Sequence, residues 1–416
     1  MIQSIRGTKD LLPDSIAYWQ FMEDVFRKVS GKFSYHEIRT PIFEKTEVFS
    51  RSIGETTDIV NKEMYTFIDK GGESVTLRPE GTANLVRSVI QNSLIQASST
   101  LRLWYSGPFF RYERPQKGRL RQFHQYGAEC IGSSYPESDA EIILLANDII
   151  SSTGIKEYKL LLNTLGSDGT REKFKSALVE YLQSSKNELS EDSKNRIETN
   201  PLRILDSKSE RDKQILHNAP VILDFLDSES LEHFEKVKEL LENSGIDIEI
   251  TPQLVRGLDY YCHTVFEFQS SALGAQDSLG GGGRYDGLFE QLGFKQKVPA
   301  VGFAMGVERL LIALEQTNSL PDINTSPKVY IATTNPDLSK FLMDIASRLR
   351  NKGISTIYDL QKRSVKAQLR DANKLNCLFT IIIGEDELKQ NKVTVKNMDT
   401  SEQTAVEIDL IDNFQF

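Results

Sequence analysis

The sequence predicts an α+β domain that is interrupted by a helical insertion and followed by a separate α/β domain. Three features of the 416-residue chain predict this: β-like runs on both sides of a long helical stretch, a Lys/Glu-rich texture within that stretch, and strands that alternate with helices near the end. The length also exceeds that of one ordinary hydrophobic core. We place the first domain at residues 1–320, with the insertion at about 169–244, and the second at residues 328–416.

The first predicted element is a helix from Asp14 to Gly31. Asp14 can cap its N-terminus and Gly31 can end it. Apolar residues recur between them at helical spacing, namely Ile16, Trp19, Met22, Val25, Phe26 and Val29. Short β-like runs follow, at Ser74–Leu77, Leu101–Tyr105 and Phe123–Ile131.

A polar segment with one glycine, Arg114–Gly118, separates Phe109–Glu113 from Arg119–Gln125. This pattern predicts two antiparallel strands joined by a mobile loop. The later insertion carries a helical stripe of apolar residues, Leu231, Phe234, Val237, Leu240 and Leu241.

Strand-like sequence returns after the insertion, at Ile246–Thr251 and Thr264–Gln269. The run Gly280–Gly283 is either a flexible turn or backbone that packs close to a bound molecule. A final helix is predicted from Gly302 to Glu315, and Asn318–Pro327 has the composition of a linker.

The second domain is predicted to alternate strands with helices, which is typical of a small α/β domain. We expect strands at Lys328–Thr333, Ile354–Tyr358 and Phe379–Ile383, helices at Asp337–Asn351 and Val365–Leu375, and two further strand-like runs.

The composition argues against several classes of protein. A net charge of −9 opposes sequence-blind binding to nucleic acid, so any such contact should come from local basic patches such as Arg111–Arg121. The three cysteines are far apart and the five histidines lack the spacing of metal ligands, so we expect no protein metal site and a reducing, cytoplasmic setting. No segment has the apolar length of a signal peptide or a membrane span, so we expect neither export nor membrane insertion.

The chain lacks the Gly-rich P-loop, with its lysine, that often marks phosphate chemistry. Arginines are the candidates for phosphate binding instead. Guanidinium groups bind phosphate oxygens as a fork and keep their charge at any working pH. Taken alone, any one of the arginines named next could equally be an ordinary surface residue. The arginines in β-rich sequence or beside it are Arg111, Arg119, Arg121, Arg256 and Arg309.

Five segments change that balance. Residues 107–115 read GPFFRYERP and continue to RLRQFHQ at 119–125; residues 300–310 read AVGFAMGVERL; residues 39–44 read RTPIFE. These resemble motifs 2, 3 and 1 of class II aminoacyl-tRNA synthetases. Residues 254–261, LVRGLDYY, and 6–10, RGTKD, are similar to segments that mark the histidyl group. The resemblance covers nearly the whole chain and implies an antiparallel sheet flanked by helices, a helical insertion and a C-terminal anticodon-binding α/β domain.

The resemblance implies an ATP-dependent ligase that activates histidine as its adenylate and transfers it to the 3′ end of tRNA(His). Arg111 would hold the α-phosphate, Arg309 the γ-phosphate, and Phe123 would stack on adenine. Arg119 and Arg121 would reach the outer phosphates, and Glu113 would belong to the ATP site. Because the nucleophile is already a carboxylate, positioning and electrostatics suffice without a general base.

For the amino acid, the resemblance assigns Arg256 to the substrate carboxylate and the α-phosphate, so Arg256 and Arg111 are the expected catalytic residues. Glu80 and Thr82, helped by Gln125, would hold the α-amino group, although a glutamate after a proline is ordinarily just a helix-start residue. The imidazole would contact Glu129 and Tyr261, which can satisfy both ring nitrogens. Tyr260 and Tyr285 are assigned to the same pocket.

The implied partners are tRNA(His), histidine and a second copy of the chain through motif 1. Arg114 and Gln116 would lie near the acceptor end of the tRNA, and Mg²⁺ would accompany ATP. A basic set in the last domain, Lys362, Arg363, Lys366, Arg370 and Lys374, is either a solvated helix face or part of an anticodon site. One position departs from the pattern: His263 stands where many relatives have arginine, and neither it nor Cys262 is assigned a catalytic role.

Three other functions share parts of this pattern. The regulatory subunit of ATP phosphoribosyltransferase has the same fold, but it lacks the last domain and typically loses catalytic residues. A class II synthetase for proline, threonine or glycine would not carry the segment from Arg256 to Tyr261. An RNA-binding descendant would be expected to have lost the ATP-binding arginines.

Overall fold

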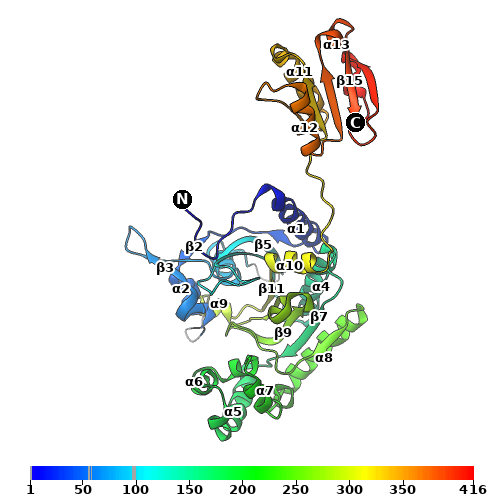
Figure 1. Ribbon diagram of the computed structural model, residues 1–416. Coiled ribbons are helices and arrows are strands. Elements are labelled where there is room, and N and C mark those ends of the chain that lie inside the picture. The colour runs from blue at the N-terminus through cyan, green and yellow to red at the C-terminus, as the bar shows by residue number, and fades with distance from the viewer. Residues whose placement is uncertain (1, 55–56, 58, 96–99) are drawn as a thin grey trace. The chain divides into compact units, whose positions relative to one another are not determined.

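The computed structural model describes residues 2–54, 57, 59–95 and 100–416. It forms two compact units, Met1–Pro321 and Asp322–Phe416 (Figure 1). Each unit has its own sheet and its own hydrophobic core.

The first unit is built on an eight-stranded mixed sheet, whose strand order is β1-β5-β6-β11-β10-β9-β7-β8. All inner pairs are antiparallel, as predicted, whereas the edge pairs β1·β5 and β7·β8 are parallel. The bounds are β1 (His36–Glu37), β5 (Leu101–Phe110), β6 (Gln122–Ile131), β7 (Lys159–Thr164), β8 (Ile248–Ile250), β9 (Cys262–Gln269), β10 (Ser278–Arg284) and β11 (Ala300–Gly306).

Helices cover one face of this sheet and share a core with it. Phe26, Ile142 and Leu310 come from three of these helices and pack with Phe266 and Phe303 of the sheet. The covering helices are α1 (Pro13–Lys32), α4 (Pro136–Thr153), α8 (Ser228–Asn243) and α10 (Val307–Gln316). Because side chains alternate along a strand, the residues between these core positions point to the opposite face, where the functional site lies.

The ends of two predicted helices differ from the sequence prediction. Asp14 does not cap α1, because the helix begins at Pro13 with Leu12 as its N-cap; proline suits the first helical position, where no N–H is needed. Gly31 lies within the last turn, and α1 ends at Lys32. The helix predicted from Gly302 begins only at Val307, since residues 300–306 form β11 in the middle of the sheet.

The segment predicted as a helical insertion is mostly helical, and its last helix packs against the main sheet. Figure 1 shows α5, α6 and α7 gathered together, whereas α8 runs beside β7. The predicted stripe of Phe234, Val237 and Leu241 is buried in the core of the main sheet, and α8 connects to the parallel edge strand β8. The helices of the gathered group are α5 (Asp168–Ser184), α6 (Glu191–Thr199) and α7 (Glu210–Leu216), with 3₁₀ turns at Lys186–Glu188, Pro201–Asp206 and Ile222–Phe225.

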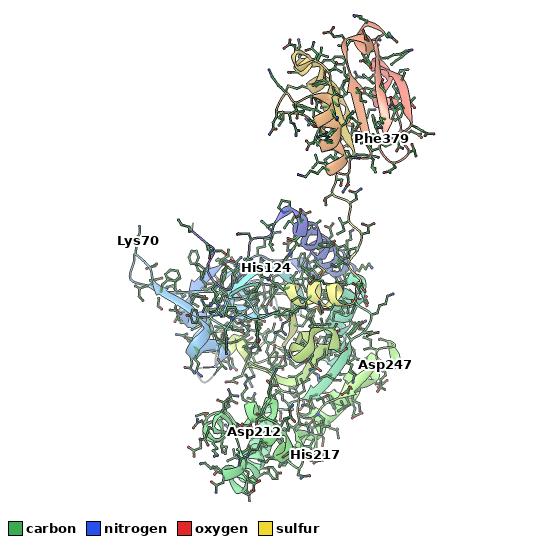
Figure 2. The ribbon with its side chains drawn as sticks, viewed as in Figure 1. Lys70, His124, Asp212, His217, Asp247 and Phe379 are labelled. Atoms are coloured by element: carbon green, nitrogen blue, oxygen red, sulfur yellow. The ribbon has the colours of Figure 1, made fainter. Side chains whose placement is uncertain are left out.

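A small three-stranded sheet, ordered β2-β4-β3, completes the first unit. Lys70 stands at the tip of its β3–β4 hairpin (Figure 2). The remaining elements are β2 (Phe43–Lys45), α2 (Thr46–Ile53), a π-helix at Ile59–Glu63, β3 (Tyr65–Ile68), β4 (Ser74–Leu77), α3 (Thr82–Gln91), a 3₁₀ turn at Ser271–Gln276 and α9 (Leu288–Gln291).

The second unit contains a five-stranded sheet, ordered β13-β12-β14-β15-β16. The pairs β13·β12 and β12·β14 are parallel and the others antiparallel, so the predicted alternation of strands and helices is confirmed. The elements are β12 (Val329–Thr333), a 3₁₀ turn at Pro336–Leu338, α11 (Ser339–Asn351), β13 (Thr356–Tyr358), α12 (Val365–Lys374), β14 (Phe379–Ile383), α13 (Glu385–Lys389), β15 (Lys392–Asn397), β16 (Gln403–Glu407) and a 3₁₀ turn at Ile408–Asn413.

The glycines of β10 are buried in the sheet and are not a turn. Gly282 pairs with Phe266 on one side and Phe303 on the other. A Cβ atom added at Gly282 would overlap the carbonyl oxygen of Gly302, and one added at Gly281 would lie 3.1 Å from the guanidinium carbon of Arg256. The run is therefore not the flexible turn that the sequence allowed as one alternative, but a strand whose backbone packs closely against its neighbours.

Replacing Gly282 with alanine is expected to destabilise the first unit by about 1–3 kcal/mol, because the new methyl group must push backbone apart. Urea unfolding followed by tryptophan fluorescence measures this unit, since both tryptophans, Trp19 and Trp104, lie in it. Gly31→Ala is the matched control. It has open space and should raise stability by about 0.5–1 kcal/mol, and equal midpoints for both variants would contradict the packing argument.

Candidate functional site

Two adjoining cavities open on the face of the main sheet that α1, α4, α8 and α10 leave free. The inner cavity measures about 230 Å³ and the outer one about 1010 Å³. Both are lined by the same group of charged residues, Arg111, Glu113, Arg119, Arg256 and Arg309. The inner cavity adds Glu80, Thr82, Phe123, Gln125, Tyr260 and Tyr261, and the outer one adds Arg203, Lys208, Lys213 and His217.

The antiparallel hairpin of β5 and β6 carries much of this lining. Phe123, Gln125 and Glu129 alternate on the cavity face of β6, while Tyr126 and Ala128 point into the core. The loop between the strands bears Arg111, whose Nε donates to the carbonyl of Pro79 at 2.8 Å.

Four arginines converge here, and carboxylates or carbonyls hold each of the other three as well. Arg119 Nη1 lies 3.4 Å from Glu113 Oε2, and Arg256 Nη1 contacts Glu267 Oε2. Arg309, in the first turn of α10, donates to the carbonyls of Gly118 at 3.2 Å and Ser278 at 2.8 Å. The guanidinium groups are thus anchored before any anion arrives.

The electrostatics of the cluster suit a polyanion. Burial and the nearby cations Arg119 and Arg111 lower the pKa of Arg309. A negatively charged ligand beside this guanidinium would stabilise its protonated form. At Arg256, burial acts to lower the pKa, but Glu267, Tyr261 and Asp206 together act more strongly in the opposite direction, so the pKa is raised. Both arginines therefore remain protonated and available to phosphate oxygens.

Phe123 offers an aromatic face to the inner cavity. Its ring centroid lies 5.3 Å from the guanidinium carbon of Arg111 and 6.2 Å from the ring of Phe109. A planar heterocycle could stack here with its phosphate groups close to the arginines.

Glu80 lies before α3 and caps that helix. Its two oxygens accept from the backbone N–H groups of Thr82 and Ala83, both at 2.7 Å. Burial raises the pKa of Glu80, while these hydrogen bonds act in the opposite direction. Glu80 therefore lies at the helix start, as the sequence suggested for a glutamate after a proline, and its carboxylate also borders the inner cavity.

Glu129 is fully buried behind the cavity wall and is surrounded by hydroxyl groups. Thr82 Oγ1 donates to its Oε1 at 2.8 Å, Tyr105 donates to the same oxygen at 3.4 Å, and Tyr285 donates to Oε2 at 2.6 Å. Gly302 on the neighbouring strand leaves room for it, because a Cβ there would overlap the carboxylate. Burial raises the pKa of Glu129 to about 8 despite the hydroxyl donors.

Three tyrosines close this end of the site. The rings of Tyr260 and Tyr261 lie 4.7 Å apart, and Tyr285 lies 5.7 Å from Tyr260. Tyr260 and Tyr261 border the inner cavity directly, whereas Tyr285 and Glu129 lie behind its surface. Gln125 also faces this end, and its buried Oε1 has no hydrogen-bond partner among the described residues.

Three predicted site residues lie away from the cavities. Arg121 stacks on Tyr112 at 4.0 Å, and its backbone N–H donates to Gly7 of the N-terminal segment, so Arg119 is the cavity residue of the pair. Arg114 and Gln116 are exposed on the loop of the hairpin. This loop is free to contact a large partner outside the cavity.

Sequence reasoning missed two groups of residues. Glu267 alternates with core residues on β9, but a lone glutamate in a strand gives no signal of its own. The insertion also contributes basic residues to the outer cavity, namely Arg203, Lys208 and Lys213, together with His217, which is labelled in Figure 2 among the insertion helices. Only the packing of the insertion against the sheet brings them here.

A tether between two parts of the site was also unforeseen. Glu308, the residue before Arg309, accepts from both the backbone N–H and the ring Nδ1 of His124 at 3.0 Å. His124, labelled in Figure 2, follows Phe123 on β6 and meets Trp19 edge to face at 4.7 Å. This contact fixes the start of α10 to the strand that carries Phe123.

Among the described residues, no cluster of three or more His, Cys, Asp or Glu side chains could hold a metal ion. No helix in the same part of the chain has the length and apolar character needed to cross a membrane. The cavities therefore combine a cationic region for a polyanion, an aromatic face, and a buried carboxylate pocket for a small polar group.

Comparison with known proteins agrees with this geometry. Residues 7–310 match the family model described as Histidyl-tRNA synthetase, and residues 328–414 match the one described as Anticodon binding domain. A Synechocystis protein named histidine–tRNA ligase is 47% identical, with 99% of this chain and 92% of that protein covered. A Bacillus velezensis protein of the same name is 48% identical, with 97% and 96% covered.

Solved structures give the same result. The chain is similar to apo histidyl-tRNA synthetase from S. aureus, with a TM-score of 0.84, 38% identity and 99% of each chain covered. It also resembles in fold a Bacillus halodurans protein titled ATP phosphoribosyltransferase regulatory subunit/histidyl-tRNA synthetase, with a TM-score of 0.66, 23% identity, and 92% of this chain and 98% of that chain covered.

The buried carboxyl of Glu129 is expected to make stability depend on pH. The unfolded chain releases this proton near pH 4.5 and the folded chain near pH 8, so the group's contribution to folding falls as the pH rises between these values. Glu129→Gln should leave the melting temperature nearly unchanged at pH 5 and raise it by several degrees at pH 9.

Thermal melts across this pH range test the expectation. Glu249→Gln, at an exposed ion pair with Lys159, is the control and should show no such divergence. A difference between Glu129→Gln and the parent that does not change with pH would show that Glu129 is already ionised in the folded chain.

Proposed function

Because the chain belongs to the histidyl-tRNA synthetase family and is a histidine–tRNA ligase, we propose that the two cavities form its active site. Such an enzyme activates histidine with ATP, giving histidyl-adenylate and pyrophosphate, and then transfers histidine to the 3′ end of tRNA(His). The observation that carries the assignment is the position of Arg256, which borders both cavities with the other arginines and borders the inner one with Tyr260 and Tyr261. A cation placed there can serve the carboxylate of one substrate and the phosphate of the other.

In the first step, a carboxylate oxygen of histidine attacks the α-phosphorus of ATP, and the bond to pyrophosphate breaks. We assign Arg111 and Arg256 to the α-phosphate, where charge develops in the transition state. Arg309 and Arg119 hold the outer phosphates, with Glu113 keeping Arg119 in place. No proton needs to be removed from the nucleophile, so fixed cations provide the catalysis.

Phe123 is proposed to stack on adenine, since its ring faces the inner cavity beside Arg111. Mg²⁺ is proposed to accompany ATP. When bound, it would neutralise part of the phosphate charge. Glu113 and Glu267 are among the carboxylates that line the outer cavity and would be available to hold it.

Histidine recognition is assigned to the tyrosine end of the inner cavity. Glu129 and Tyr261 would satisfy the ring nitrogens, with Tyr285 fixing the Glu129 carboxylate through its 2.6 Å hydrogen bond. Reaching Glu129 requires Thr82 or a tyrosine to shift, because the carboxylate lies behind the cavity surface. A pocket that pairs both ring nitrogens rejects side chains lacking them.

The α-amino group of histidine is proposed to bind among Glu80, Thr82, Gln125 and Tyr260. Gln125 supports this best, since its buried Oε1 lacks a partner among the described residues and can accept an N–H. Glu80 already accepts two backbone N–H groups, but each carboxylate oxygen has capacity for another donor.

In the second step, a hydroxyl of the terminal ribose of tRNA attacks the adenylate carbonyl, and AMP leaves. The exposed Arg114 and Gln116 are proposed to contact the acceptor end. The unit Asp322–Phe416 is proposed to bind the anticodon. Within the basic set of that unit, Arg363 is paired with Asp359 and Asp371, so the exposed Lys362, Lys366, Arg370 and Lys374 are better placed for RNA phosphates.

We also propose a cytoplasmic homodimer. The small sheet beside motif 1 exposes apolar side chains that a partner would cover, namely Ile42, Phe43, Phe67 and Ile68. The three cysteines are free, as in a reducing compartment. The alternative of a phosphoribosyltransferase regulatory subunit is not favoured, because relatives matched over nearly their full length carry the ligase name.

Pyrophosphate exchange into ATP, driven by each standard amino acid in turn with Mg²⁺, tests the active-site assignment. Exchange with histidine alone is expected. Exchange with another amino acid would overturn the recognition pocket, and no exchange from folded protein would overturn the catalytic assignment.

Arg256→Ala should lower the rate of exchange by about 10²- to 10³-fold while weakening ATP binding much less, because its contact strengthens in the transition state. Steady-state exchange gives kcat, and equilibrium dialysis with ATP gives the binding constant. Arg27→Ala, which breaks an exposed pair on α1, is the control. Weaker ATP binding with unchanged turnover would show a purely binding role for Arg256.

A further inference from the structure

Among the described residues, Glu267 is the carboxylate that forms an ion pair with Arg256. It lies on β9 between the core residues Phe266 and Phe268, so strand alternation directs it to the cavity face. The next residue on that face, Gln269, donates from Nε2 to Glu267 Oε1 at 2.8 Å. One oxygen of Glu267 is thereby fixed by Gln269, and the other contacts Arg256 Nη1.

The Arg256 guanidinium packs against the backbone of the neighbouring strand β10. Gly281 pairs with Glu267 across β10 and β9, and a Cβ at Gly281 would lie 3.1 Å from the guanidinium carbon. The guanidinium therefore lies over bare backbone, with its side limited by Glu267. Its Nε is buried and has no hydrogen-bond partner among the described residues, which leaves this donor for an incoming ligand.

The surrounding charge makes such a restraint necessary. Arg111, Arg119 and Arg309 border the same cavity, and like charges drive a flexible guanidinium towards solvent. A long arginine side chain also has much rotamer freedom to lose when it is ordered. A fixed carboxylate removes both costs before substrates bind.

We propose that Glu267 is a positioning residue for adenylate formation, which holds the Arg256 guanidinium over Gly281 in the orientation that meets the substrate carboxylate and the α-phosphate. This rests on the proposed role of Arg256. Glu267 acts through Arg256, so its removal affects turnover and has no effect once Arg256 is gone.

A double-mutant cycle tests the coupling. Glu267→Gln keeps the size and one acceptor but loses the charge, and it should lower kcat for pyrophosphate exchange by about 10- to 100-fold with small changes in KM for ATP and histidine. In an Arg256→Ala background the same change should have no further effect. Glu249→Gln on the nearby edge strand is the control.

Chemical rescue separates positioning from a merely structural role. Guanidinium ion added to Arg256→Ala should restore part of the exchange activity, and the double variant Arg256→Ala/Glu267→Gln should lose that rescue. Rescue of equal size in both variants, or additive losses in the cycle, would overturn the proposal. So would a Glu267→Gln variant whose only change is a higher Mg²⁺ requirement.

The outcomes also distinguish this inference from the active-site assignment. If Arg256→Ala has normal exchange, the role of Arg256 itself is wrong. If Arg256→Ala is impaired but Glu267→Gln is not, only the inference fails. Melting curves establish that each variant is folded, and Glu267→Asp provides a second, charged variant with a shorter reach, expected to fall between the parent and Glu267→Gln.

Discussion

Repulsion between like charges is the constraint on which this active site depends. Four guanidinium groups border one cavity, and without anchors they would spread into solvent. The fold holds them with groups that are already fixed by secondary structure: the carbonyls of Pro79, Gly118 and Ser278 and the carboxylates of Glu113 and Glu267. Binding of a polyphosphate then relieves repulsion within an ordered set of cations, so little reorganisation is needed at the moment of reaction.

The end of the site assigned to the amino acid contains a buried carboxylate, which is held by hydroxyl groups and, among the described residues, has no paired cation. Glu129 is fully buried, and in the described part of the chain its hydrogen-bond donors are the hydroxyl groups of Thr82, Tyr105 and Tyr285. Its ionised form is therefore costly until a ligand with an N–H group arrives. The buried Glu129 carboxylate therefore both selects the ligand and lowers the stability of the fold, as is common at binding sites.

Sequence reasoning reached the arginines and the tyrosines because they occur in segments with a distinctive order of residues. It misplaced the start of α10. Gly302 and its neighbours form a central strand, but the small residues in this segment resemble those of a helix. It also grouped α8 with the insertion, because the stripe of Phe234, Val237 and Leu241 shows that a face is buried and not against which partner. Glu267 was missed for the same reason: its role depends on a contact across two strands and a loop, and no local pattern records it.

The bare stretch of β10 also limits how this site can be altered by protein engineering. Where Gly280 and Gly281 line the inner cavity, its wall consists of peptide groups, and any substitution there can only add volume. A wider pocket for a larger amino acid cannot be obtained at these two positions. Altered substrate range has to come from lining residues that do have side chains to lose, such as those on β6 and Tyr260 and Tyr261.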